Sequence, residues 1–182
     1  MCAALAWTQA ARAAGTLPAP GDYAVDVRGS QVTFNVTNFL VASVDGRFSS
    51  FRARVTVGGS LAATHIEATV DVKSIDTGIA GRDEHLRSED YFDVAKFPLM
   101  TFTSTMLWGT PENFGIRGNL TIKGTTREVV FSARILESGV VLAEGKIDRT
   151  TFGITSGASI KNEVRLRLQI RMIPPAAPPP AQ

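Results

Sequence analysis

The sequence predicts an all-β fold, namely an antiparallel up-and-down barrel of about eight strands with one short helical insertion around residues 78–97. Three observations lead to this prediction. Apolar and polar residues alternate in stretch after stretch, turn-forming residues separate these stretches, and a single charged segment interrupts them. The chain has 182 residues, of which 44% are hydrophobic, and this is enough apolar material for one well-buried domain.

The alternation has a period of two residues, as in strands with one dry face and one solvated face. It is clearest near the C-terminus, where Val164, Leu166 and Leu168 alternate with Arg165 and Arg167. The predicted strands are residues 32–37, 48–57, 66–73, 100–105, 114–122, 129–135, 140–147 and 164–172. Eight is the number of strands at which an up-and-down barrel can close around one ligand.

Turn-forming residues lie between the predicted strands. They include VGGS at 57–60, GTPEN at 109–113, KGT at 123–125 and ESG at 137–139. Gly, Pro, Asn and Ser favour tight turns because they adopt or fix the required backbone angles. Short turns of this kind favour antiparallel neighbours over parallel crossovers.

One charged segment breaks the strand pattern. Residues 81–98 read GRDEHLRSEDYFDVAKFP, with Leu86 and Phe92 as apolar positions. Asp83 and Glu84 come early, where a helix dipole favours acidic groups, and Pro98 ends the segment. We therefore predict one or two short helical turns that cap one mouth of the barrel.

Composition excludes several classes of protein. Lys and Arg number 19 against 17 Asp and Glu, and the arginines are scattered, so nucleic-acid binding is not expected. No run approaches the roughly 18 apolar residues that a membrane helix needs. The single cysteine, Cys2, cannot form an internal disulfide, and His65 and His85 are too few for a His-rich metal site. We expect no metal and no required cofactor.

The two ends are predicted to lie outside the folded unit, which spans residues 21–174. Residues 1–20 include ARA at 11–13, the small-x-small pattern of a secretory cleavage point, but lack a positive n-region. They are either a truncated export signal, which we favour, or a flexible Ala-rich arm. Residues 175–182 are rich in proline and are predicted to be a disordered tail.

The alternating apolar face either fills a solid core or lines a cavity, and periodicity alone leaves both open. Aromatic residues are numerous enough for either arrangement. The candidate cavity-lining residues are Phe34, Val36, Asn38, Phe39, Phe48, Val70, Phe102 and Phe131.

Three blocks of sequence resemble the YceI-like family. They are SIDTG at 74–78 with RDEHLRSEDYFD at 82–93 and KFP at 96–98, then GNLTIKGTT at 118–126, then DRTTFGI at 148–154. VDGRF at 44–48 fits the x-x-G-x-F start of the family pattern. The blocks occur in the family's order over most of the folded unit, which makes the resemblance specific.

The resemblance implies a lipocalin-like barrel that is typically exported to the bacterial periplasm, so a periplasmic or secreted location is expected. It also implies an elongated apolar cavity that holds a long isoprenoid, a quinone or another fatty chain. The family often carries a histidine where this chain has Asn38, so head-group preference is expected to differ. A hydrophobic small molecule is thus the expected partner, and a homodimer stays open.

Charged residues of the insertion are candidates for contact with a head group. These rim candidates are Arg82, Asp83, His85, Arg87 and Arg149. Arginine suits bidentate contacts to an anionic head group. In the structural alternative, Asp83 and Arg149 form an ion pair that holds the insertion on the barrel. His85 is a conceivable base, but no nucleophile motif accompanies it, so no catalytic residue is predicted.

Three functions therefore remain after the sequence is read. The first is a lipid-binding barrel that acts as a carrier or scavenger without catalysis. The second is a stress-related interaction protein with a solid interior and an exposed apolar patch. The third is a lipid-acting enzyme, which requires His85 or an acidic pair to face the cavity.

Overall fold

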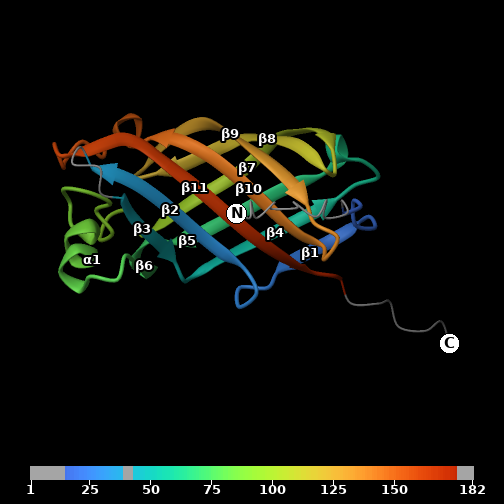
Figure 1. Ribbon diagram of the computed structural model, residues 1–182, viewed down its shortest axis with the longest axis horizontal. Coiled ribbons are helices and arrows are strands. Elements are labelled where there is room, and N and C mark those ends of the chain that lie inside the picture. Colours follow the sequence, from blue (N-terminus) through green and yellow to red (C-terminus); the bar gives the residue numbers. More distant parts are fainter. Residues whose placement is uncertain (1–14, 39–42, 176–182) are drawn as a thin grey trace, which may run out of the picture.

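The computed structural model describes residues 15–38 and 43–175 and confirms the predicted all-β class (Figure 1). In these residues the strands are β1 (Gly21–Val25), β2 (Gln31–Asn38), β3 (Ser43–Phe48), β4 (Phe51–Val57), β5 (His65–Asp71), β6 (Ile75–Asp76), β7 (Leu99–Thr110), β8 (Asn113–Ile122), β9 (Thr125–Ile135), β10 (Val140–Asp148) and β11 (Ile160–Ile173). The helical elements are α1 (Ala80–Arg87) and the short 3₁₀ turns η1 (Leu61–Ala63), η2 (Val72–Ser74) and η3 (Arg149–Phe152).

Eight strands close an antiparallel barrel in the order β1, β4, β5, β7, β8, β9, β10 and β11, and β11 pairs back onto β1. The other three strands extend the wall, because β2 pairs with β11, β3 with β2, and β6 with β3. β1 and β2 thus pair with successive parts of β11 and are two halves of one broken strand. In the next strand, β4 pairs with β1 and β3 pairs with β2. In the strand after that, β5 pairs with β4 and β6 pairs with β3. The barrel is an eight-stranded one in which three strands are broken in two, which agrees with the predicted number.

Two details of the strand prediction are corrected. Residues 48–57 were expected to form one strand, but β3 ends at Phe48 and β4 begins at Phe51. The interruption falls at Ser49 and Ser50, whose small polar side chains carry no apolar alternation. β1 was not predicted, because its five residues are too few for a clear period-two pattern.

The predicted helical insertion is present as α1 followed by a series of turns that reach Pro98. It lies at one end of the barrel, and β1 lies toward the other (Figure 1). Asp83 stands in the first turn of α1, where the helix dipole favours a negative charge. In the part of the chain that the structure describes, no helix combines the length and the apolar character needed to cross a bilayer.

The described N-terminal residues contribute to the interior. The backbone N–H of Gly15 donates to the carbonyl of Ile135 at 3.0 Å, and Leu17 packs against the core. The Tyr23 hydroxyl donates to the carbonyl of Ala19 at 2.8 Å, which holds this segment beside β1. The remainder of the predicted N-terminal arm, and the predicted tail beyond Pro175, lie outside the described residues.

Candidate functional site

The barrel encloses a cavity of about 280 Å³, slightly below the range of about 300–1,000 Å³ that is usual for sites that hold small organic molecules. Inward-facing residues of all eight barrel strands line it, from Val25 of β1 to Met172 of β11. Leu61 of η1 lines it beside the β1 end, and Leu86 and Phe92 of the insertion line it at the other end. Because α1 and β1 lie at opposite ends (Figure 1), the cavity runs along the length of the barrel.

The structure brings most of the predicted cavity residues together around this space. Those that line it are Phe34, Val36, Phe48, Val70, Phe102 and Phe131. Asn38 is not among the lining residues, because the register between β2 and β11 shifts between the pairs Val36↔Val164 and Asn38↔Ile160. Strict alternation therefore does not extend to the last residue of β2. Phe39 lies outside the described residues.

Aromatic rings of the lining lie over glycines in neighbouring strands. A Cβ atom on Gly46 would come within 2.2 Å of Phe34, and one on Gly145 within 2.7 Å of Phe131. Each of these glycines is the direct register partner of its phenylalanine. A ring that occupies the side-chain space of a glycine covers the wall and leaves the centre of the barrel free. The strand glycines thus contribute to an open interior.

The lining is almost entirely apolar. Two polar residues of the lining are themselves buried, Thr64 and Arg149, and Arg149 is the charged one, with 7% of its surface exposed. Its N–H groups all donate to main-chain carbonyls of the segment after η3, those of Ile154, Ser156, Gly157, Ile160 and Lys161. A guanidinium whose five donors are occupied in this way shapes the loop and has no free N–H for a head group.

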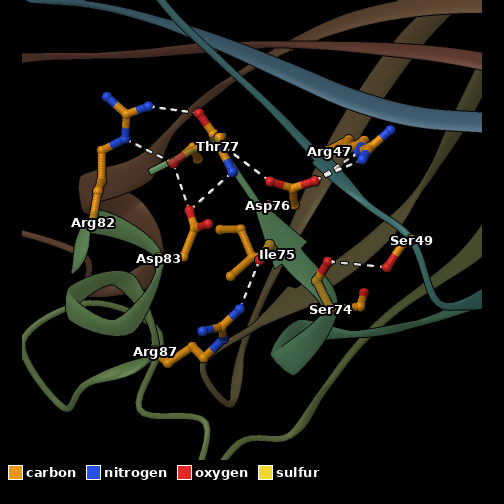
Figure 2. A network of polar contacts seen from close by, with 10 residues as sticks. Arg47, Ser49, Ser74, Ile75, Asp76, Thr77, Arg82, Asp83 and Arg87 are labelled. Carbon is orange, nitrogen blue, oxygen red and sulfur yellow. Dashed lines mark hydrogen bonds and ion pairs between the residues drawn. The ribbon is translucent and has the colours of Figure 1, made fainter. Parts of the chain in front are cut away.

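The charged residues at the start of the insertion make a network with the chain that precedes it (Figure 2). Asp83 accepts hydrogen bonds from the backbone N–H and the hydroxyl of Thr77. Arg82 donates to the hydroxyl and the carbonyl of Thr77, both at 2.7 Å, and Arg87 donates to the carbonyl of Ile75 at 2.8 Å. These three side chains fasten α1 to β6 and the residues that follow it.

The expected ion pair between Asp83 and Arg149 is not formed among the described residues, where each side chain has other partners. Thr77 lies only six positions before Asp83 and takes up its carboxylate instead. The structural interpretation of the insertion is therefore right in kind but wrong in its pairing, because local hydrogen bonds satisfy both groups.

His85 lies on the outer side of α1 and does not line the cavity. Its Nε2 is 3.9 Å from the Asp90 carboxylate, and its ring meets Tyr91 edge-on at a centroid distance of 5.0 Å. With 62% of the side chain exposed, the imidazole is a surface group. Of the rim candidates, only Arg149 touches the cavity.

Asp76, which lies next to this network, faces solvent. The pKa of Asp76 is lowered, first by the hydrogen bond from the backbone N–H of Gly78 and then by the hydrogen bond from Arg47. Arg47 reaches Asp76 with Nη2 at 2.7 Å and Nε at 3.0 Å. The pair joins β3 to β6 on the outer surface, and neither residue lines the cavity.

Sequence reasoning missed several lining residues outside the regular strands. Leu17 and Pro18 lie in the segment predicted to be a truncated export signal or a flexible arm, and Tyr91 lies in the insertion. Leu86 and Phe92, the two apolar positions in the charged insertion, were the available signal for it. No comparable signal marks Leu17, since the residues around it do not alternate.

The chain is similar in sequence to a known protein family. The model of the YceI-like domain matches residues 23–172. Protein YceI of Salmonella newport (strain SL254) is 33% identical over 147 residues, which cover 74% of this chain and 77% of the relative.

Solved structures share the fold. BcnA of Burkholderia cenocepacia has a TM-score of 0.74 at 24% identity, over 80% of this chain and 98% of that one. A polyisoprenoid binding domain from Saccharophagus degradans, implicated in plant cell wall breakdown, has a TM-score of 0.66 at 15% identity, over 84% of this chain and 98% of that one. The family model, the curated relative and the shared barrel agree, and the chain belongs to the YceI-like family.

Proposed function

We propose that this protein binds a long-chain isoprenoid or a related lipid, such as a quinone or a fatty amide, inside its barrel. We further propose that it acts in the periplasm as a carrier or scavenger, without catalysis. The observation that carries the proposal is the apolar cavity that runs along the barrel. Hydrocarbon chains are the ligands that an apolar, elongated interior fits best.

The energetics favour a long ligand. Burial of one methylene is worth about 0.8 kcal/mol, so a long chain offers a gross gain on the order of 15 kcal/mol. Loss of translational and chain freedom cancels a large part of this gain. One methylene more or less changes affinity by only about 1–3 kcal/mol, so loose selection of chain length is expected.

The comparisons support the same class of ligand. The Saccharophagus degradans neighbour is described as a polyisoprenoid binding domain and has the same barrel fold. The family membership of this chain favours export, because family members are typically periplasmic.

The two other functions are less well supported. A solid-core interaction protein requires a filled interior, and the cavity argues against one. A lipid-acting enzyme requires a general acid or base at the cavity. Among the described residues that line the cavity there is no Asp, Glu or His, and we therefore favour a binding role.

The test is mass spectrometry of organic extracts from natively expressed protein, with heat-denatured protein as control. A stoichiometric isoprenoid, quinone or fatty amide in the native sample alone supports the proposal and identifies the ligand class. If the extract is empty, long-chain isoprenoids are added and the melting temperature is measured. A ligand that binds only the native state must raise it, so an unchanged melting temperature refutes the proposal.

A further inference from the structure

The wall of the barrel is interrupted between β9 and β10. Register pairs between these strands run from Val141↔Ile135 to Gly145↔Phe131 and stop there. β9 continues at its other end to Thr125 and pairs there with β8 alone, and β10 continues to Asp148 and pairs there with β11 alone. No ladder hydrogen bonds therefore hold these two strands together beyond Gly145.

A groove of about 840 Å³ lies on the outside of the barrel along this interruption. Its walls come from β9, β10, η3 and β11. The lining mixes charged residues, such as Arg127 and Asp148, with apolar ones, and Val130 is exposed there. The groove thus offers both polar and apolar contacts, in contrast to the cavity.

One layer of side chains separates the groove from the cavity. Ile147, Phe152 and Leu166 line both spaces. Phe152 is the largest of these and is almost fully buried, with 1% of its surface exposed. A movement of this ring is the smallest change that would join the groove to the interior.

Phe152 ends an element whose first residue, Arg149, is held by the carbonyls of the following loop, so the movement that opens the wall is one of the Phe152 ring and not of η3 as a whole. η3 has four residues, is capped by the Asp148 carboxylate and ends at Gly153, whose φ of 77° is in the left-handed region. It contributes no residue to any strand pair. Between strands that are paired along most of their length, such as β7 with β8 and β8 with β9, passage would require paired backbone groups to separate, which costs free energy for each bond lost.

The ends of the barrel are less suited to passage. Leu86 and Phe92 face the cavity at one end on an insertion that Asp83, Arg82 and Arg87 fasten to the chain before it. Leu61 of η1 faces it at the other end, with Leu17 beside the core. Each end is thus covered by packed or hydrogen-bonded chain.

We infer that the hydrocarbon chain of the ligand enters and leaves the cavity sideways, between β9 and β10, with Phe152 as the gate. This inference rests on the proposed function, since it describes the route to the same cavity. An amphiphile that uses this route passes its chain inward past Phe152 while its polar end stays at the charged groove.

The test closes the gap reversibly and measures exchange. Val130→Cys and Lys146→Cys are introduced in a Cys2→Ser background; these positions continue the register beyond Phe131↔Gly145 and are exposed. A short bis-methanethiosulfonate reagent joins the two thiols, and dithiothreitol releases them. Association and dissociation of dansyl-labelled geranylgeraniol are followed by fluorescence in the joined and released states of the same protein.

The control is the same reagent across a wall that is already paired. Thr103 and Asn119 are register partners on β7 and β8 and are exposed, so Thr103→Cys with Asn119→Cys gives a matched pair. Joining this pair is expected to change neither rate. Phe152→Leu, which keeps an apolar but smaller side chain, is expected to speed both rates several-fold.

The outcomes separate the two proposals. Joining positions 130 and 146 should slow both rates at least tenfold, leave the equilibrium affinity within twofold and be reversed by reduction. If the probe binds with unchanged rates after joining, the lateral route is wrong and the binding function stands. If neither the labelled nor the unlabelled geranylgeraniol binds the unmodified protein, the proposed function and the route both fail.

Discussion

Two sides of the barrel are built from the same kind of residue and pack differently. On β8 and β9 the inward side chains are almost fully buried, as for Phe114, Ile116, Phe131 and Ile135. On β11 the inward side chains keep part of their surface accessible, as for Val164, Leu166, Leu168 and Ile170. Both sets line the cavity. Alternation therefore reports which side chains face inward, while their partners decide how tightly they pack.

The partners across the strands explain the difference. In the β8–β9 pair, Ile116 stands opposite Phe131, so large side chains meet on the inner face. In the β10–β11 pair, Leu166 and Leu168 stand opposite Gly145 and Ala143, which bring no large side chain of their own to the inner face. We call the inward-facing residues of β8 and β9 the packed wall. We call the residues of β11, β2 and β5 that border the cavity the open wall.

The largest expected effect is a difference in stability between two variants that each lose a phenylalanine ring, one from the packed wall and one from the open wall. Phe131→Ala, in the packed wall, should lower the free energy of unfolding by about 3–5 kcal/mol, because it removes buried surface and leaves a void. Phe34→Ala, in the open wall, should cost less than about half of this, since Phe34 is only partly buried and its removal takes less surface out of the core. Urea unfolding measures both, and equal losses would mean that the walls do not differ.

Enlarging an alanine in each wall sharpens the comparison. Ala133 is 5% exposed in the packed wall, and Ala133→Leu should cost about 1–3 kcal/mol through overpacking. Ala68 borders the cavity, and Ala68→Leu should retain stability but weaken binding of an added isoprenoid. The two readouts are urea unfolding and the ligand-induced rise in melting temperature. Retained binding in Ala68→Leu would place the ligand elsewhere.

The attachment of the α1 insertion to the chain before it depends on hydrogen bonds made by Asp83, Arg82 and Arg87. Asp83→Ala leaves two donors of Thr77 without their acceptor and should cost about 1–2 kcal/mol. Asp90→Ala is the matched control, since Asp90 is an exposed carboxylate 3.9 Å from His85 and its removal should change little. Thermal unfolding distinguishes them, and an equal effect of both substitutions would contradict the anchoring role of Asp83.

The smallest expected effect is a loss of stability at low pH, which depends on carboxyl groups on the outer surface and not on the cavity. Hydrogen bonds from Thr150 lower the pKa of Asp148, and those from Gly78 and Arg47 lower that of Asp76. Carboxyls with a pKa lowered by folding stabilise the protein above their unfolded pKa, near pH ~4, and this stabilisation is lost as the pH falls through the folded value. The melting temperature should therefore decline below about pH 4.

Ligand affinity, in contrast to the melting temperature, should not depend on pH in the range in which the protein is folded. The cavity lining has no carboxyl or imidazole group among the described residues, so affinity for a neutral isoprenoid should stay constant between about pH 8 and about pH 5. Fluorescence titration across this range measures it. A change in affinity centred near pH 6.5 would instead implicate a histidine.

Much of the fold followed from local pattern, and the exceptions have physical causes. Alternation identified Phe34, Phe48 and Phe131 as inward-facing because a strand has a fixed period of two. It failed at Asn38, where a register shift interrupts the period. It also carried the predicted strand 48–57 across Ser49 and Ser50, because the point at which a strand breaks depends on which neighbours each half finds.

The site itself was less predictable from sequence. The rings over Gly46 and Gly145 depend on which strands become neighbours, and one strand's sequence does not contain that information. The same holds for Arg149, whose guanidinium is enclosed by carbonyls rather than by the expected carboxylate of Asp83. Every type of residue has a backbone carbonyl, so no sequence motif predicts which carbonyls will accept these hydrogen bonds.

Closure of the barrel has a consequence for the order in which the protein can fold. β1 meets β11 through only two register pairs, Ala24↔Ile173 and Val25↔Met172, and β2 also takes its partner from β11. The first strands to leave the ribosome therefore wait for the last one before their hydrogen bonds are complete. Contacts between distant parts of a chain form slowly, and an unpaired strand edge invites association with another chain. The interval before β11 is available is thus the period in which this chain most needs protection from aggregation.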